Sequence, residues 1–179
     1  MSLVELLVSL ALVGGVLTAT MLALDQMERA HATGVARMES QQTARIALER
    51  LAHDVRRAGF ANGPSAGFAA VSIADPGQIQ LQLDLNSDGV IAGPGETITW
   101  HLDGSGILRR NAGGGAQPIV NGVRAFSLDY FDGTDAPAGD PAAVRSVVAS
   151  LTTAAWSGTS ELAAGVSTTV QTRVRLRNR

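Results

Sequence analysis

The sequence predicts an α+β protein in which one long N-terminal helix packs, over its second half, on an antiparallel β-sheet head. Two observations support this. The first ~58 residues contain no strong helix breaker and change from uniformly apolar to amphipathic near residue 25. Beyond residue 60, turns rich in Gly, Asp and Pro separate short runs with alternating apolar side chains. We therefore expect an apolar helix segment over 1–24, an amphipathic helix that continues into the head over 25–59, and a globular head over 60–179.

The apolar segment is long enough to cross a membrane. Between residues 1 and 24 the only ionisable side chain is Glu5, and 24 helical residues span about 36 Å against about 30 Å for a hydrocarbon core. A secretory signal would need a basic start, a shorter apolar run and a small-residue cleavage site. Here the apolar run leads directly into a polar helix that begins at Asp25. The segment therefore indicates a membrane-spanning helix.

Glu5 is out of place in such a helix. A carboxylate near the centre of a bilayer costs about 2.5 to 3.5 kcal/mol, and less toward an interface. Glu5 could lie at headgroup level, where it also meets the positive end of the helix dipole. Alternatively, another chain could supply a charge partner for it.

The N-terminal residues Met1 to Leu10, with a small hydroxyl residue at Ser2 and an acid at Glu5, resemble the mature N-terminus of type IV pilins and pseudopilins. The resemblance implies that a prepilin peptidase cuts before Met1 and N-methylates the new amine. It also implies that Glu5 pairs with the N-terminal amine of a neighbouring subunit during filament assembly. The implied locations are the inner membrane, with a single span and a periplasmic head, and then an extracellular pilus or a periplasmic pseudopilus.

Two positions depart from the usual pilin pattern. Met1 stands where phenylalanine is usual, and Leu22 stands where many major pilins carry a helix-kinking proline. Gly14 and Gly15 could loosen the helix, since each glycine costs about 1 kcal/mol relative to alanine. They could equally permit close contact between helices.

The second half of the helix is amphipathic. Five residues share one stripe by steps of four and three: Ala44, Leu48, Leu51, Val55 and Ala58. Charged residues are expected off this stripe: Arg45, Arg50, Asp54 and Arg57. Gly59 suits a left-handed C-cap, and a loop follows at 62–64, so the helix should end near Ala58.

This helix end also resembles a known group. Residues 41–60, which end in Asp54-x-Arg56-x-Ala58-Gly59-Phe60, are similar to PilW-type minor pilins and the related J-type pseudopilins, as is the terminal stretch 173–178. The resemblance implies a minor pilin of the priming or tip complex, with roles in adhesion, motility or secretion. A pseudopilin or a major pilin is the alternative, and a monomeric membrane-tethered calcium- or ligand-binding module is an alternative of another class. The implied partners are other pilin subunits, the pilus assembly machinery and the peptidase.

Several runs in the head have the period-two pattern of strands. They are 78–85, 97–102, 107–110, 123–131, 144–152 and 166–176. The turn at 103–106 should join the second and third runs into a hairpin, and 132–141 should be a surface loop.

One loop has the spacing of a calcium site. Asp84, Asn86 and Asp88 alternate before Gly89, with the Val90 carbonyl as a further candidate ligand. The bidentate acid expected at loop position 12 is absent, since Glu96 lies one residue late. An Asx-rich turn that needs no metal is the simpler interpretation.

The remaining composition argues against catalysis and against nucleic acid as the main partner. The 14 basic residues are all arginine and there is no cysteine, which excludes lysine and thiolate chemistry. The net charge is −2, which argues against nucleic acid as the main partner. His31, His53 and His101 have no metal-ligand spacing. Four arginines, at 173, 175, 177 and 179, share one face of the last strand. We interpret them as a solvated face that limits edge pairing, with contact to DNA or an acidic partner as the alternative.

Overall fold

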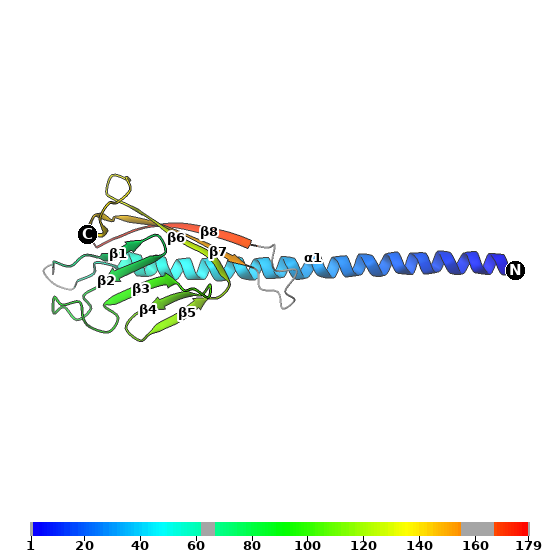
Figure 1. The fold of residues 1–179 in the computed structure, drawn as a ribbon, viewed down its shortest axis with the longest axis horizontal. Helices are drawn as coiled ribbons and strands as arrows, with labels where there is room; N and C mark the ends of the chain where they lie inside the picture. The colour runs from blue at the N-terminus through cyan, green and yellow to red at the C-terminus, as the bar shows by residue number, and fades with distance from the viewer. Residues whose placement is uncertain (1, 62–66, 155–166, 179) are drawn as a thin grey trace.

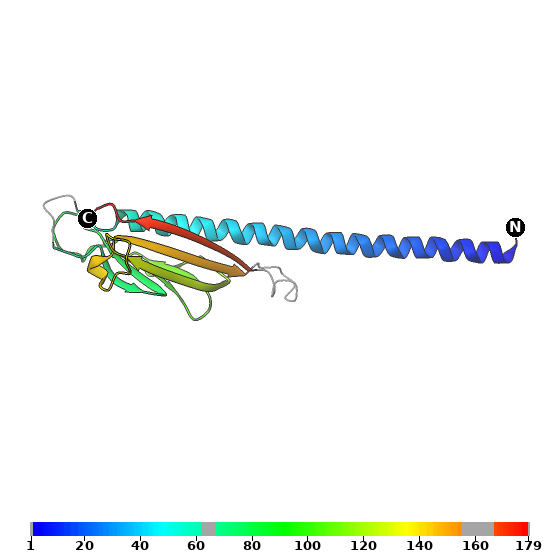
Figure 2. The ribbon, with the colours of Figure 1, turned by 90° about the horizontal axis from the view of Figure 1, so that it is seen from above.

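A computed structural model describes residues 2–61, 67–154 and 167–178. A long helix, α1 (Leu3–Arg57), projects from a β head, and its N-terminus lies far from the head (Figures 1 and 2). The first buried residue of the helix is Ala36, so roughly the first half of α1 contacts nothing else in the described chain. The predicted α+β class is confirmed.

The head contains two antiparallel sheets where the sequence suggested one. Five strands follow each other in chain order in the first sheet: β1 (Val71–Asp75), β2 (Gln78–Gln82), β3 (Thr97–Leu102), β4 (Leu108–Asn111) and β5 (Ala116–Val120). The second sheet has three: β6 (Val123–Phe131), β7 (Ser146–Ala154) and β8 (Ser167–Arg175). A short 3-10 helix, η1 (Pro141–Ala143), precedes β7.

Both sheets and the helix share one core. The apolar stripe of α1 is buried as predicted, from Ala44 to Ala58. Leu51 and Val55 are about as buried as Ile79 and Leu81 of β2 and Leu151 of β7. Burial of this stripe holds the helix to the head through the hydrophobic effect.

Polar contacts connect the helix to the second sheet and the second sheet to the first. Ser40 of α1 and Thr153 of β7 share a buried hydroxyl hydrogen bond of 2.7 Å. Tyr130 of β6 donates its hydroxyl to the carbonyls of Asp75 (2.8 Å) and Gln78 (3.0 Å), and so ties the second sheet to the first. Burial raises the pKa of Tyr130, so the hydroxyl stays a donor at physiological pH.

Asp54 corrects the sequence analysis, which placed it off the buried stripe. It is 2% exposed and accepts hydrogen bonds from Trp100 Nε1 (2.9 Å) and Arg110 Nε (2.7 Å). A helix stripe read from apolar residues alone cannot include a carboxylate, and only the sheet supplies the partners that make its burial tolerable.

The end of α1 agrees with the prediction. The last helical residue is Arg57, and Gly59 has φ +76°, a left-handed conformation. A Cβ at Gly59 would lie 2.5 Å from the carbonyl oxygen of Asn178, so glycine is required on two counts. The side chain of Asn178 donates to the Arg57 carbonyl (3.3 Å) and caps the helix from the far end of the chain.

The strand predictions differ in accuracy. Runs 97–102 and 123–131 are confirmed at both ends, the hairpin at 103–106 is confirmed, and the loop after β6 is confirmed. The run at 78–85 ends earlier, because the Asp84 amide leaves the sheet to bond the Phe60 carbonyl (2.8 Å). Strands β1 and β5 were not predicted from the sequence.

Candidate functional site: the apolar half of the helix

The N-terminal half of α1 presents apolar side chains to solvent on every side. No residue of its most apolar 18-residue window is buried, and among the large apolar side chains from Leu3 to Leu24 the least exposed is Leu24, at 49%. By length and composition α1 is the one helix of the described chain that could cross a membrane. A continuous exposed apolar surface of this kind marks contact with lipid or with another protein.

Three hydroxyl side chains of this segment form their hydrogen bonds within the helix. Ser9 Oγ donates to the Leu6 carbonyl (2.9 Å), and Thr18 Oγ1 donates to the Gly14 carbonyl (2.8 Å). Thr20 does the same one turn back, to Val16 (2.8 Å). Hydroxyl groups bonded in this way carry no unmet donor into an apolar medium, so they are compatible with burial in lipid or between helices.

Glu5 lies in the first turn of the helix. Ser2 is the N-cap, and its backbone amide lies 3.4 Å from Glu5 Oε2, a long hydrogen bond that reaches back to the helix start. This contact engages only one carboxylate oxygen of an exposed side chain. Met1, which the sequence analysis pairs with Glu5 of a neighbour, lies outside the described residues.

Gly14 and Gly15 lie inside a continuous helix. A Cβ built at either position meets nothing within 4 Å. Intramolecular packing therefore does not require these glycines. Whether they loosen the helix or admit a close neighbour stays a prediction.

The predicted calcium loop lies between β2 and β3, at the end of the head. Asp84 is buried, and its two carboxylate oxygens accept from the amides of Ser87 (2.7 Å) and Gly89 (3.1 Å). Asn86 and Asp88 bond each other, with 2.8 Å between Nδ2 and Oδ2. These are the contacts of an Asx-rich turn.

Glu96 closes the same loop from inside. It is 1% exposed and accepts four backbone hydrogen bonds, from Leu85 (3.1 Å), Asn86 (3.4 Å), Ala92 (3.1 Å) and Gly93 (2.5 Å). These bonds, led by that of Gly93, lower the pKa of Glu96 against the opposing effect of burial. Glu96 therefore stabilises the loop from inside through these four bonds, a role that the calcium motif did not suggest.

A cation would have to compete with these amides. The Val90 carbonyl also accepts a bond within the loop, from Ala92 (3.1 Å). Among residues 2–61, 67–154 and 167–178, no group of three or more His, Asp or Glu side chains is placed to hold a metal. Calcium binding by Asp84, Asn86, Asp88, Val90 and Glu96 stays a prediction.

The histidines remain apart. His31 and His53 lie on α1 and His101 lies on β3. His53 Nδ1 lies 3.9 Å from Asp54 Oδ1, a carboxylate that Trp100 and Arg110 already hold.

Neither a family model nor a curated protein matches the sequence. Among solved structures, a type IV-like pilin from Thermus thermophilus is similar at a TM-score of 0.44 and 14% identity, over 77% of this chain and 93% of that chain. At this level of similarity function has to be inferred from the residues themselves.

Proposed function

We propose that this chain is a non-enzymatic structural subunit of a type IV pilus-like filament, anchored in the inner membrane before assembly. The observation that carries the proposal is the segment of α1 from Leu3 to Leu24, which is apolar on every side, is not buried by the described head, and carries one acid, Glu5. Such a surface is stable in lipid and equally stable in a bundle of like helices. A subunit that moves between these two environments needs both properties.

Glu5 supplies what apolar packing lacks, which is a defined axial register. Packing of similar apolar helices can slide, whereas a carboxylate in a low-dielectric bundle is costly unless an opposite charge lies beside it. The N-terminal amine of a neighbouring subunit is the charge that the resemblance to pilins implies. Among the residues that the structure describes, the Ser2 amide is the one partner of Glu5, which leaves most of the carboxylate for this pairing.

A minor subunit of the priming or tip complex is the form we favour. Support comes from the segment Asp54 to Phe60, which resembles PilW-type minor pilins and forms the junction between helix and head. Asp54 holds Trp100 and Arg110, and Gly59 donates its amide to the Gln82 carbonyl (2.8 Å). Copy number in purified filaments separates a minor from a major subunit. Presence in a secretion pseudopilus would instead favour a pseudopilin.

Substitution of Glu5 tests the proposal. Glu5→Gln should leave membrane insertion intact, because it removes a charge from the apolar segment, but it should lower incorporation into sheared filaments at least about tenfold, the equivalent of about 1.4 kcal/mol. Glu28→Gln, which removes an acid from the polar part of the same helix, should incorporate normally. Equal incorporation of the Glu5 variant and the native chain would contradict the role of Glu5. A subunit never found in filaments, but tethered as a monomer, would favour the ligand-binding module instead.

Mass spectrometry gives an independent test of processing. The proposal requires a prepilin peptidase, and an N-methylated peptide beginning at Met1 is its product. Recovery of such a peptide from sheared surface fibres would also place the chain outside the cell.

A further inference from the structure

The end of the head farthest from the helix N-terminus contains a charged pocket. It has a volume of about 370 Å³ and lies where the loop after β6 folds over the outer face of the three-stranded sheet. Three arginines and two aspartates are among its lining residues: Asp132, Asp135, Arg145, Arg173 and Arg175. The sequence analysis grouped two of these arginines as part of a solvated face, and the structure brings them together with a third.

Strand register places the arginines. Ser146 of β7 pairs with Phe131 of β6 on one side and with Arg175 of β8 on the other, so these three residues share one line across the sheet. Arg173 lies two residues earlier on β8, on the same face as Arg175. Arg145 comes directly before β7, which brings it to the same end of the sheet.

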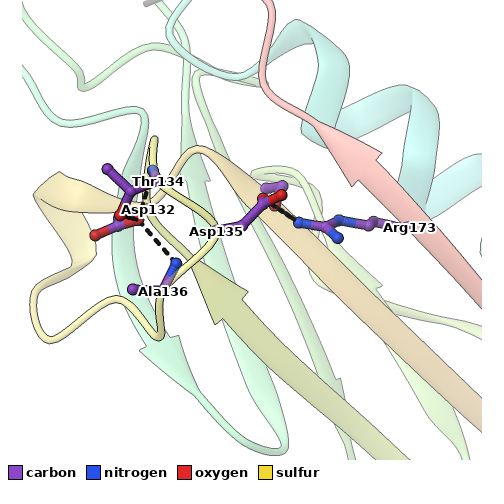
Figure 3. A network of polar contacts seen from close by, with 6 residues as sticks. Asp132, Thr134, Asp135, Ala136 and Arg173 are labelled. Carbon is purple, nitrogen blue, oxygen red and sulfur yellow. Dashed lines mark hydrogen bonds and ion pairs between the residues drawn. The ribbon is translucent and has the colours of Figure 1, made fainter.

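Arg173 is held in a fixed orientation. Its guanidinium lies 5.1 Å from the ring centroid of Phe131 and donates to Ser146 Oγ at 3.1 Å. It also forms an ion pair with Asp135 (Figure 3). Asp135 is 73% exposed at its side chain and has φ +64°, a conformation unusual outside glycine. An exposed carboxylate on a strained turn is a weak partner that another carboxylate could replace.

Two other charges of the pocket are already engaged. Asp132 Oδ1 accepts from the amides of Thr134 (2.7 Å) and Ala136 (3.1 Å), which shape the loop (Figure 3). Arg145 Nη1 donates to the carbonyls of Ala142 (3.1 Å) and Val144 (3.0 Å). Both side chains therefore line the pocket but are less available to bind a ligand.

Arg175 is the arginine of the pocket that is available to bind a ligand. It is exposed, and within the described ranges no ion pair or hydrogen bond of its side chain is found. Together with Arg173 it presents two guanidinium groups on one face, a geometry suited to a planar carboxylate.

We propose that this pocket binds one carboxylate of an acidic peptide segment on a partner protein, which bridges Arg175 and Arg173 and displaces Asp135. Three arginines against two aspartates leave one positive charge, which matches a single carboxylate. A phosphate dianion would bring two negative charges toward the same two aspartates and would be repelled more strongly than a carboxylate. Nucleic acid is a poorer fit to its phosphate charges, because two aspartates line the pocket, the sheet beside it carries exposed Asp129, and the chain is net negative.

The location fits a protein partner. The loop after β6, which lines the pocket, lies at the opposite end of the molecule from the apolar helix tip (Figures 1 and 2), so the pocket stays accessible when that tip is in a membrane or bundle. The inference concerns the head alone and does not depend on filament assembly.

The test measures binding of a labelled, end-capped tetraglutamate peptide to the full chain in detergent micelles, at low salt, by fluorescence polarisation. Binding should be seen with tetraglutamate and not with tetraglutamine. Arg175→Gln should weaken it at least about tenfold, since a charge-assisted bond is lost. Arg177→Gln makes the same charge change two residues on, outside the pocket, and should alter affinity less than about twofold. Asp135→Asn should tighten binding, because it removes the internal competitor for Arg173.

The last variant separates a binding role from a structural one, since damage to the fold would not increase affinity. Equal weakening by Arg175→Gln and Arg177→Gln would overturn the proposal in favour of unspecific attraction, as would weaker binding by Asp135→Asn. Tighter binding of inorganic phosphate or of a single-stranded oligonucleotide than of tetraglutamate would overturn the choice of a carboxylate.

Discussion

One helix contains two regions with opposite surroundings. Residues 36–57 bury one stripe against two sheets, whereas residues 3–24 bury nothing, although the second region is the more apolar. Backbone geometry is the same in both, so helix formation alone explains neither. The difference shows that the head-packed region is stabilised within the chain, while the apolar region has to obtain its stabilising contacts outside it.

The largest effect on the head-packed region is expected at Asp54. Asp54→Ala leaves Arg110, whose side chain is 18% exposed, without its partner, and it leaves the buried Trp100 N–H without an acceptor. Breaking such a pair costs about 3 to 5 kcal/mol. Chemical denaturation of the full chain in detergent should show this loss, with membrane insertion unchanged. A loss below about 1 kcal/mol would mean that the pair does not fix the helix on the sheet.

In the apolar region we expect the opposite result, in which a substitution impairs membrane insertion and leaves the stability of the head unchanged. Leu17→Arg puts a charge in the middle of the segment at a cost of about 2.5 to 3.5 kcal/mol for insertion, so the membrane-bound fraction should fall sharply. Head stability should not change, because Leu17 is 58% exposed and lies well before Ala36, the first helix residue that is buried in the described structure. Fractionation of membranes and thermal unfolding measure the two effects separately. If Leu17→Arg unfolded the head, the two regions would not be independent.

A smaller effect, dependent on pH, is expected in the loop held by Glu96. The folded protein lowers the pKa of Glu96 below its ordinary value of 4.5, so its contribution to stability is present above that pH and is lost as pH falls below it. Glu96→Gln should lower the thermal unfolding midpoint of the head at pH 7, because one amide group cannot accept from all four donors. The gap between the variant and the native chain should narrow on acidification through pH 4.

The same variant tests the calcium prediction. Thermal unfolding of the native head with added calcium or with a chelator measures any stabilisation by the ion. A midpoint that rises with calcium, and does not rise in Glu96→Gln, would favour a cation in this loop.

Sequence periodicity was enough to predict the helix, its C-terminus and most strands. The steps of four and three from Ala44 to Ala58 are a local property, and so is the alternation of Thr97 to Leu102. Of the two missed strands, β1 carries that signal over only two residues, Val71 and Ile73, and β5 lacks it. β5 is short, is mostly exposed, and contains Pro118, which fits only an edge strand.

The rest depends on contacts between residues distant in sequence. Asp54 meets Arg110, Tyr130 meets Asp75, and Asn178 caps the helix at Arg57, and no local pattern encodes these pairs. The apolar region was predictable for the opposite reason. Its composition from Leu3 to Leu24 needs no long-range partner within the chain.

The most direct test of the central claim uses the absence of cysteine in the native sequence. Single variants Val13→Cys, in the apolar region, and Glu28→Cys, beyond it, each provide one reactive thiol for a membrane-impermeant maleimide. We predict that Val13→Cys is protected both in membranes and in sheared filaments and reacts only after detergent, while Glu28→Cys reacts in membranes opened to expose the periplasmic face. Labelling of Val13→Cys as fast as Glu28→Cys in intact membranes would contradict the account, because the apolar region would then lie in water.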